Sequence, residues 1–337
     1  MLLQLHSLLS LAVSTRASDL HLSACNVPWL RIDGVLQPVA DTAVFANEQL
    51  EAMLYVILND QQSYEFKKNL EIDFAYDMAN LGRFRVNIFQ KHGGIAAVFR
   101  IIAKEIPSLD VLQLPKVIEN FPQLKNGLVL ITGPTGSGKT TTLASILDYI
   151  NNNEARHIIT IEDPIEYVHQ NKLSLINQRE VGRDTLSFQN ALRVALREDP
   201  DILLVGELRD LTTIRLALTA AETGHLVFAT LHTASAAKSI TRMVDVFPGN
   251  EQALVRTMLA DSLRVVVAQM LCKKQGGGRI AATEIMFCTP AISNLIRENK
   301  ISQINSQIQT GAAFGMHTLE QDLRRLEMDR VVMESLE

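Results

Sequence analysis

Two different patterns of hydrophobic and polar residues divide the chain. Before about residue 103, the stretches EIDFAYDM and GRFRVNIFQ alternate apolar and polar residues at every second position, which is typical of strands with one buried face. Proline and glycine separate several short stretches of this kind, and residues 47–68 favour one or two helices. We therefore expect residues 1–103 to form a small mixed α+β domain.

Beyond about residue 116, uninterrupted apolar runs alternate with helix-like segments. The runs GLVLIT, HIITI, DILLVG and HLVFATL are typical of parallel strands that are covered on both faces. Their alternation with helices predicts an α/β sheet within residues 116–337. After Pro248 we expect mostly helix, with one strand in GRIAATEIMF. Residues 104–115 contain two prolines and show no clear period, so they are the expected linker.

The opening residues, MLLQLHSLLSLAV, have the apolar character of a secretion signal, but no cation precedes them and polar residues interrupt them. Leu2, Leu5, Leu9 and Val13 would share one face of a helix, which predicts a buried amphipathic helix. No apolar run approaches the ~20 residues that a membrane span needs. We therefore expect a cytoplasmic protein that does not itself cross a membrane.

Length and composition exclude several classes of function. A chain of 337 residues is long for one hydrophobic core, which favours two domains. The net charge of -5 argues against general nucleic-acid binding. The cysteines Cys25, Cys272 and Cys288 are far apart and form no CxxC pair. This spacing argues against a disulfide framework or a thiolate zinc site, and it fits a reducing cytoplasm.

Residues 133–140, GPTGSGKT, fit the phosphate-binding pattern G-x-x-x-x-G-K-[ST] at every fixed position. The strand-like GLVLIT precedes the pattern and the helix-like TTTLASILDYI follows it, as this motif requires. Lys139 is expected to reach the β and γ phosphates and the Thr140 hydroxyl to ligate Mg²⁺. The expected ATP-binding residues are Gly133, Pro134, Thr135, Gly136, Ser137, Gly138, Lys139, Thr140 and Thr141.

Acidic residues follow two of the predicted strands, at the sheet edge where α/β proteins bind ligands. In HIITIEDPIEYVH, Pro164 turns the chain and could aim Glu166 at the phosphates, where a carboxylate activates the attacking water. A solvated acidic loop explains the spacing of these residues equally well. In DPDILLVGELRD, Glu207 is expected to hold Mg²⁺ or polarise the nucleophile, and the alternative is an acid that caps the next helix.

Two histidines frame the predicted strand HLVFATL. His232 falls at its carboxyl end, the same edge as the phosphates, and is expected to sense the γ-phosphate. His225 falls at the opposite end, where a subunit or domain interface is the better interpretation.

Together and in this order, the motifs resemble those of the secretion-superfamily hexameric ATPases, and among them the type IV pilus retraction ATPases. The resemblance covers nearly the whole chain: ASDLHLSA and RIDG resemble the start of a PAS-like N-terminal domain, TIEDPIEYVH the Asp box, VGELRD the Walker B motif and GHLVFATLHT the His box. It implies a RecA-like P-loop ATPase domain with a helical C-terminal region, preceded by a smaller PAS-like domain.

The resemblance also implies roles for single residues. Glu166 matches the water-activating glutamate, Glu207 the Walker B glutamate, and His225 and His232 the two His-box positions. In this family, arginines from the N-terminal domain and from the subunit interface complete the ATP site. The matching positions are Arg85 and Arg100 in the first domain, and Arg193 and Arg197, which we expect to share one face of a helix.

The resemblance implies a ring of six that hydrolyses ATP with Mg²⁺ to power pilus retraction and twitching motility. Such a motor would act at the cytoplasmic face of the inner membrane through a platform protein, with a second retraction ATPase as a further partner. The segment AISNLIREN has Ser293 where the retraction signature AIRNLIRE has arginine. Alternatives are therefore an accessory retraction ATPase, or a pilus assembly or type II secretion ATPase. A nucleic-acid translocase and a scaffold without turnover are weaker alternatives.

Overall fold

The computed structural model describes residues 2–32, 34–78, 81–102 and 105–332. The chain forms two compact units that meet in sequence between Glu105 and Ile106. Each unit has its own sheet and its own hydrophobic core. Among the described residues, no helix is long and apolar enough to cross a membrane.

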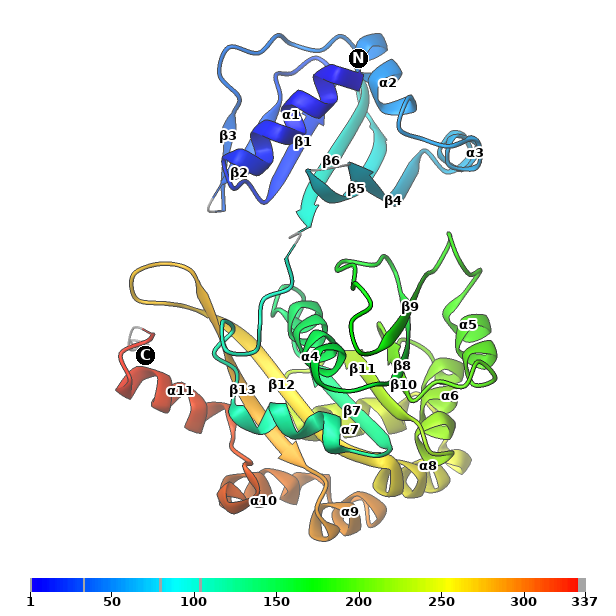
Figure 1. Cartoon of the computed structure of the whole chain (residues 1–337), viewed down its shortest axis with the longest axis vertical. Helices are drawn as coiled ribbons and strands as arrows, with labels where there is room; N and C mark the ends of the chain where they lie inside the picture. Colours follow the sequence, from blue (N-terminus) through cyan, green and yellow to red (C-terminus); the bar gives the residue numbers. More distant parts are fainter. Residues whose placement is uncertain (1, 33, 79–80, 103–104, 333–337) are drawn as a thin grey trace. The chain divides into compact units, whose positions relative to one another are not determined.

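The first unit is a six-stranded sheet in the order β3-β2-β1-β6-β5-β4, and its neighbouring strands run antiparallel. Three helices accompany this sheet (Figure 1). The elements are α1 (Leu2–Ser14), β1 (Asp19–Ser23), β2 (Trp29–Ile32), β3 (Val35–Pro38), α2 (Asn47–Tyr55), α3 (Asp60–Asn69), β4 (Glu71–Met78), β5 (Gly82–Lys91) and β6 (Gly94–Ile102).

The opening residues form helix α1, as their pattern predicts, but the buried face differs from the expected one. Leu5, Leu8, Leu9 and Ala12 are buried in the core of the first unit, whereas Leu2 is exposed. The prediction that Leu2 lies on the buried face was wrong. Leu8 and Ala12 occupy the inner face instead, because the helix is apolar almost all round and its period alone does not select one side.

The second unit is a seven-stranded sheet in the order β13-β12-β7-β11-β10-β8-β9, parallel except for the pair β12–β13. Its elements are η1 (Lys116–Gln123), β7 (Gly127–Thr132), α4 (Lys139–Asn153), β8 (His157–Glu162), β9 (Leu175–Glu180), α5 (Phe188–Ala195), β10 (Ile202–Val205), α6 (Leu211–Glu222), β11 (Leu226–Leu231), α7 (Ala236–Asp245), α8 (Gly249–Ser262), β12 (Leu263–Lys273), β13 (Arg279–Phe287), α9 (Pro290–Arg297), η2 (Ile301–Gln303), α10 (Ile304–Thr310), η3 (Ala312–Phe314) and α11 (Leu319–Met328).

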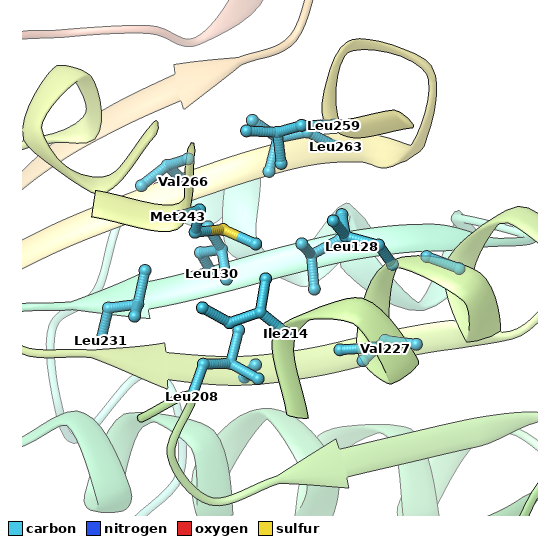
Figure 2. Packing of buried hydrophobic residues seen from close by; sticks show 14 of the residues in the cluster. Leu128, Leu130, Leu208, Ile214, Val227, Leu231, Met243, Leu259, Leu263 and Val266 are labelled. Atoms are coloured by element: carbon cyan, nitrogen blue, oxygen red, sulfur yellow. The ribbon is translucent and has the colours of Figure 1, made fainter. Parts of the chain in front are cut away.

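Both faces of this sheet are covered, which explains the uninterrupted apolar runs. On β7, Leu128 and Leu130 face a core shared with helices α5 to α10, whereas Val129 and Ile131 face a core shared with α4 and η1. Figure 2 shows part of the first core, where Ile214 of α6 and Met243 of α7 lie over the strands. Since successive side chains point to opposite faces and both faces are covered, such strands consist mostly of apolar residues.

Two strands of the second unit, β9 and β12, were not expected. Residues after Pro248 were predicted to contain a single strand, yet β12 is an 11-residue strand that pairs with both β7 and β13. Helix α8 ends at Ser262 and β12 begins at Leu263, so no glycine or proline separates them. A short apolar run without punctuation is compatible with either a buried helix or a buried strand.

Candidate functional site

The phosphate-binding loop joins the end of β7 to the start of α4, as the motif predicts. Gly133 (φ +145°) and Gly138 (φ +86°) adopt backbone conformations that favour glycine. A Cβ atom on Gly133 would lie 2.2 Å from the Gln269 carbonyl oxygen, so no other residue fits there. The two glycines allow the chain to turn tightly into helix α4.

Lys139 is buried beneath this loop. Its Nζ donates hydrogen bonds to the carbonyl oxygens of Gly133 (2.7 Å) and Pro134 (3.0 Å). Burial lowers the pKa of Lys139, and the carboxylates of Glu207 and Glu166 oppose that shift by stabilising the cation. The structure therefore brings both predicted catalytic acids near the loop lysine.

Two polar atoms at the loop support anion binding. The hydroxyl oxygens of Thr132 and Ser137 are buried and have no hydrogen-bond partner among the residues that the structure describes. Leaving such groups unpaired is costly, so buried polar atoms in native proteins nearly always have partners. A phosphate group or an ordered water at the loop would provide them, and the site thus fits a nucleotide.

Glu207 follows β10, and its backbone is held from both sides. The Gly206 N–H donates to the Ile161 carbonyl of β8 (2.8 Å), and the Leu208 N–H donates to the Thr230 carbonyl of β11 (3.0 Å). These bonds place Glu207 at the carboxyl edge of the sheet, between the two neighbouring strands. The sheet order, rather than the local sequence, thus determines where this side chain lies.

The Glu207 carboxylate lies between two basic side chains. One oxygen is 2.8 Å from an Arg209 nitrogen, and the other is 3.3 Å from His232 Nε2. Burial alone would raise the pKa of Glu207, but the Arg209 hydrogen bond and charge, together with His232, outweigh it and leave the pKa lowered. On its other side, His232 Nδ1 lies 3.5 Å from the hydroxyl of Thr135 in the phosphate-binding loop. His232 therefore connects Glu207 to this loop.

The acidic segment after β8 is held by buried hydrogen bonds. Glu162 accepts bonds from the hydroxyl of Thr160 (2.6 Å) and the amide of Gln178 (3.2 Å). The next residues turn at a cis bond between Asp163 and Pro164. Because Glu162 is already engaged in the core, Glu166 is the half-buried carboxylate of this segment that remains close to Lys139.

The segment is also held beside the phosphate-binding loop. The Ile165 N–H donates to Glu180 (3.0 Å), and the Tyr167 hydroxyl lies 3.1 Å from that of Thr141 in the first turn of α4. These contacts flank Glu166 on both sides and so fix the backbone that carries it.

Arg85 and Arg100 lie directly opposite each other on β5 and β6. Arg85 pairs with Asp73 (3.8 Å) and Arg100 with Asp19 (3.0 Å). Both belong to the first unit, whereas the phosphate-binding loop belongs to the second, so their role at an ATP site stays a prediction.

Arg193 and Arg197 were expected to share a helix face. Arg193 lies in the last turn of α5, but the helix ends at Ala195 and Arg197 lies in the turn that follows. The expectation of one helical face for both was therefore wrong, because the helix stops before the second arginine. Both side chains are exposed.

His225 precedes β11, and its Nδ1 lies 3.1 Å from the Ala220 carbonyl oxygen, at the opposite end of the strand from His232.

Sequence reasoning missed two basic residues near Glu207. A cavity of about 290 Å³ is lined by Glu207, Leu208, Arg209, Leu231, His232, Thr233 and Arg242. Arg209 and Arg242 add two cations to a space bordered by the proposed γ-phosphate sensor. A larger cavity, about 360 Å³, involves none of the predicted site residues; its lining is Gln113, Leu114, Pro115, Lys116, His317, Gln321, Asp322 and Arg325.

Ser293 lies on α9, where Ile292 and Ile296 face the core. The Ser293 hydroxyl donates to the Ala260 carbonyl of α8 (3.0 Å) and lies 3.3 Å from the Cys288 sulfur. The serine therefore helps to join α9 to α8.

A family model described as "Type II/IV secretion system protein" matches residues 2–330. The type IV pilus retractation ATPase PilT of Pseudomonas aeruginosa is 56% identical over 319 residues, which are 95% of this chain and 92% of that protein. The twitching motility protein of Neisseria gonorrhoeae is 51% identical over 326 residues, covering 95% and 87%. A crystal structure of the pilus retraction motor PilT with bound ADP has a TM-score of 0.89 at 45% identity, covering 96% of this chain and 92% of that one.

These similarities confirm the fold class and the ATPase activity that the motifs predicted. They also confirm the resemblance to pilus retraction ATPases. The match extends through both units and is not limited to the phosphate-binding loop. The chain belongs to the family of type II/IV secretion system proteins.

Proposed function

We propose that this ATPase powers the retraction of type IV pili as a ring of six subunits, acting through a platform protein at the cytoplasmic face of the inner membrane. The observation that carries the proposal is the convergence of Lys139, Glu207 and His232 on one phosphate-binding loop. The similarity to a pilus retraction ATPase and to a twitching motility protein, along most of their length, supports the choice of substrate.

ATP binds at the loop between β7 and α4. Backbone N–H groups of residues 133–140 surround the phosphates, and the amino-terminal end of α4 adds a favourable dipole. Lys139 exchanges its bonds to the Gly133 and Pro134 carbonyls for phosphate oxygens, which costs little because the ammonium is already desolvated.

The oxygen-rich residues at the loop fit Mg²⁺, which prefers few protein ligands and keeps several waters. Thr140 in the first turn of α4 and the ionised Glu207 would hold it, and it would supply charge neutralisation for the departing phosphate. Glu166 orients the attacking water and accepts its proton, for which its half-buried position near Lys139 is suited.

His232 reports the state of the site because it touches both Glu207 and Thr135. Arg85, Arg100, Arg193 and Arg197 complete the site at subunit boundaries. Cations that pair with a phosphate close an interface, and release of that phosphate opens it. This cycle converts hydrolysis into movement of one subunit against the next.

The test is the number of surface pili in cells that lack the protein, compared with cells restored with wild type, with Lys139→Ala or with the control Lys125→Ala. Lys125 is exposed and outside the phosphate-binding loop. We expect excess pili without the protein and with Lys139→Ala, and normal numbers with wild type and Lys125→Ala.

Other pilus counts, or the results of assays of secretion, retraction force and ATP turnover, would overturn the proposal. Cells without pili would indicate an assembly motor, and unchanged pili with lost secretion would indicate a secretion ATPase. Retraction that continues without the protein, but with weaker force, would indicate an accessory retraction ATPase. Salt-sensitive stimulation of ATP turnover by DNA would instead indicate a nucleic-acid translocase.

A further inference from the structure

Gln269 lies on the unexpected strand β12, beside the phosphate-binding loop. The residue before it, Ala268, pairs with Thr132, the last residue of β7. Gln269 is therefore level with the point where β7 becomes the loop. Gln269 is 3% exposed, which is unusual for a glutamine, and the other buried residues of β12 are all apolar.

This single residue contacts both ends of the loop. Its side-chain Nε2 donates a 2.6 Å hydrogen bond to the Ser137 carbonyl oxygen. Its backbone carbonyl oxygen lies 2.2 Å from the position that a Cβ atom on Gly133 would occupy. On Gly138, a Cβ atom would lie 3.3 Å from Nε2. The loop is thus packed against Gln269 where it begins and where it ends.

The hydrogen bond to Ser137 also orients the next N–H group. In a trans peptide the carbonyl and the following N–H point in opposite directions. With the Ser137 carbonyl held toward Gln269, the Gly138 N–H points away from β12. Phosphate-binding loops act through such backbone N–H groups, so the direction of this peptide affects phosphate binding.

The chemistry of the amide supports one orientation of the side chain. If the amide were rotated by 180°, its oxygen would face the Ser137 carbonyl oxygen and the bond would be lost. In the observed orientation Oε1 is buried without a partner among the described residues. The amide thus remains in an unfavourable environment with one hydrogen bond, the one that reaches the loop.

On its other side, β12 is joined to the C-terminal helix α11. Gln269 pairs with Thr283 of β13, whose N–H and hydroxyl donate to the buried Asp322 carboxylate at 2.8 and 3.1 Å. Arg325 donates to the second oxygen of Asp322 (2.9 Å). Asp322 thus fixes Thr283, the residue of β13 that pairs with Gln269.

We propose that Gln269 is a positioning residue for nucleotide binding, which orients the phosphate-binding loop and links it through Thr283 and Asp322 to α11. This inference rests on the proposed nucleotide site and concerns binding, because Gln269 acts through the loop backbone. Loss of its donor lets the Ser137–Gly138 peptide rotate and weakens the affinity for phosphates.

The test compares Gln269→Met with Gln252→Met. Methionine has a similar length but cannot donate a hydrogen bond. Gln252 is the matched control, because its Nε2 also donates to a backbone carbonyl, that of Phe247 (3.1 Å), on helix α8. The measurements are the affinity for a fluorescent ADP analogue, KM and kcat for ATP, and the thermal unfolding temperature.

We expect Gln269→Met to raise KM and the dissociation constant roughly threefold to tenfold, the effect of one neutral hydrogen bond, with little change in kcat. Gln252→Met should leave both constants unchanged. Unchanged nucleotide affinity in folded Gln269→Met, or an equal loss in Gln252→Met, would overturn the inference. If the wild-type protein bound no nucleotide, the proposed function itself would be refuted.

Asp322→Asn provides a second variant if Gln269→Met does not fold. It weakens the bonds to Thr283 and should raise KM about twofold in the wild-type background. Where Gln269→Met folds, adding Asp322→Asn to it should have no further effect, because the path to the loop is already broken. A KM unchanged by Asp322→Asn, or additive effects in the double variant, would contradict the link to α11.

Discussion

The segment that carries Glu166 contains a buried histidine that should make the protein sensitive to acid. His169 is 9% exposed, and its Nδ1 has no partner among the described residues. Its backbone N–H donates to Gln178, which also bonds Glu162 (2.8 and 3.2 Å). Burial lowers the pKa of His169 from 6.5 to about 4; Asp148 opposes the shift and Lys172 adds to it.

The sign and size of the effect follow from this shift. Between pH 6.5 and about 4 the unfolded chain binds a proton at this site that the folded chain does not, so acid favours unfolding. The contribution of neutral His169 to folding stability is fully present above pH 6.5 and is lost as the pH falls toward 4. At pH 5 this titration lowers the free energy of unfolding by about 2 kcal/mol, and at pH 7.5 its effect is close to zero.

The assay is urea unfolding at pH 7.5 and pH 5.0 for wild type, His169→Gln and the control His92→Gln, an exposed histidine. His169→Gln lowers stability at both pH values, but it removes the titrating group. Wild type and His92→Gln should lose about 2 kcal/mol more than His169→Gln between the two pH values. His21 and His317, whose pKa values are also lowered by burial, contribute equally in all three proteins. Equal pH dependence in wild type and His169→Gln would refute the reasoning.

Three further substitutions test the site and the helical region. Gly133→Ala places a Cβ atom 2.2 Å from the Gln269 carbonyl oxygen, so nucleotide binding should fall at least ~100-fold, about 3 kcal/mol, in an equilibrium titration. Glu166→Gln should lower kcat roughly 100-fold or more without loss of ADP affinity, which phosphate-release kinetics and ADP titration would check. Ser293→Arg forces a larger side chain between α9 and α8 and should cost about 1–3 kcal/mol in urea unfolding; a more stable variant would contradict the packing described.

The parts of the site that lie close together in sequence could be predicted well. The loop from Gly133 to Thr140 is a contiguous motif between a strand and a helix, and its chemistry depends on local backbone geometry. Glu207 and His232 follow apolar runs, and strand ends of a parallel sheet meet at one edge. The rule places both at the same edge, and the adjacency of β10 and β11 in the sheet brings them to 3.3 Å.

Other features depended on information that no local pattern contains. The strand β12 was missed because α8 runs directly into it at Leu263 and its apolar residues suit a buried helix equally well. With the strand, Gln269 was also missed. Arg197 was expected on a helix that in fact ends at Ala195, an end that a four-residue spacing cannot predict.

By itself, the sequence determined the two kinds of sheet, the phosphate-binding loop and the acids that follow the strands. These depend on periodicity, glycine conformation and chain direction, which act over a few residues. Only the tertiary structure decided that β12 lies beside β7, so that Gln269 contacts Ser137, and that Arg209 meets Glu207 on the side opposite His232. Strand order and side-chain contact are set by the packing of distant segments into shared cores, where long-range burial outweighs local preference.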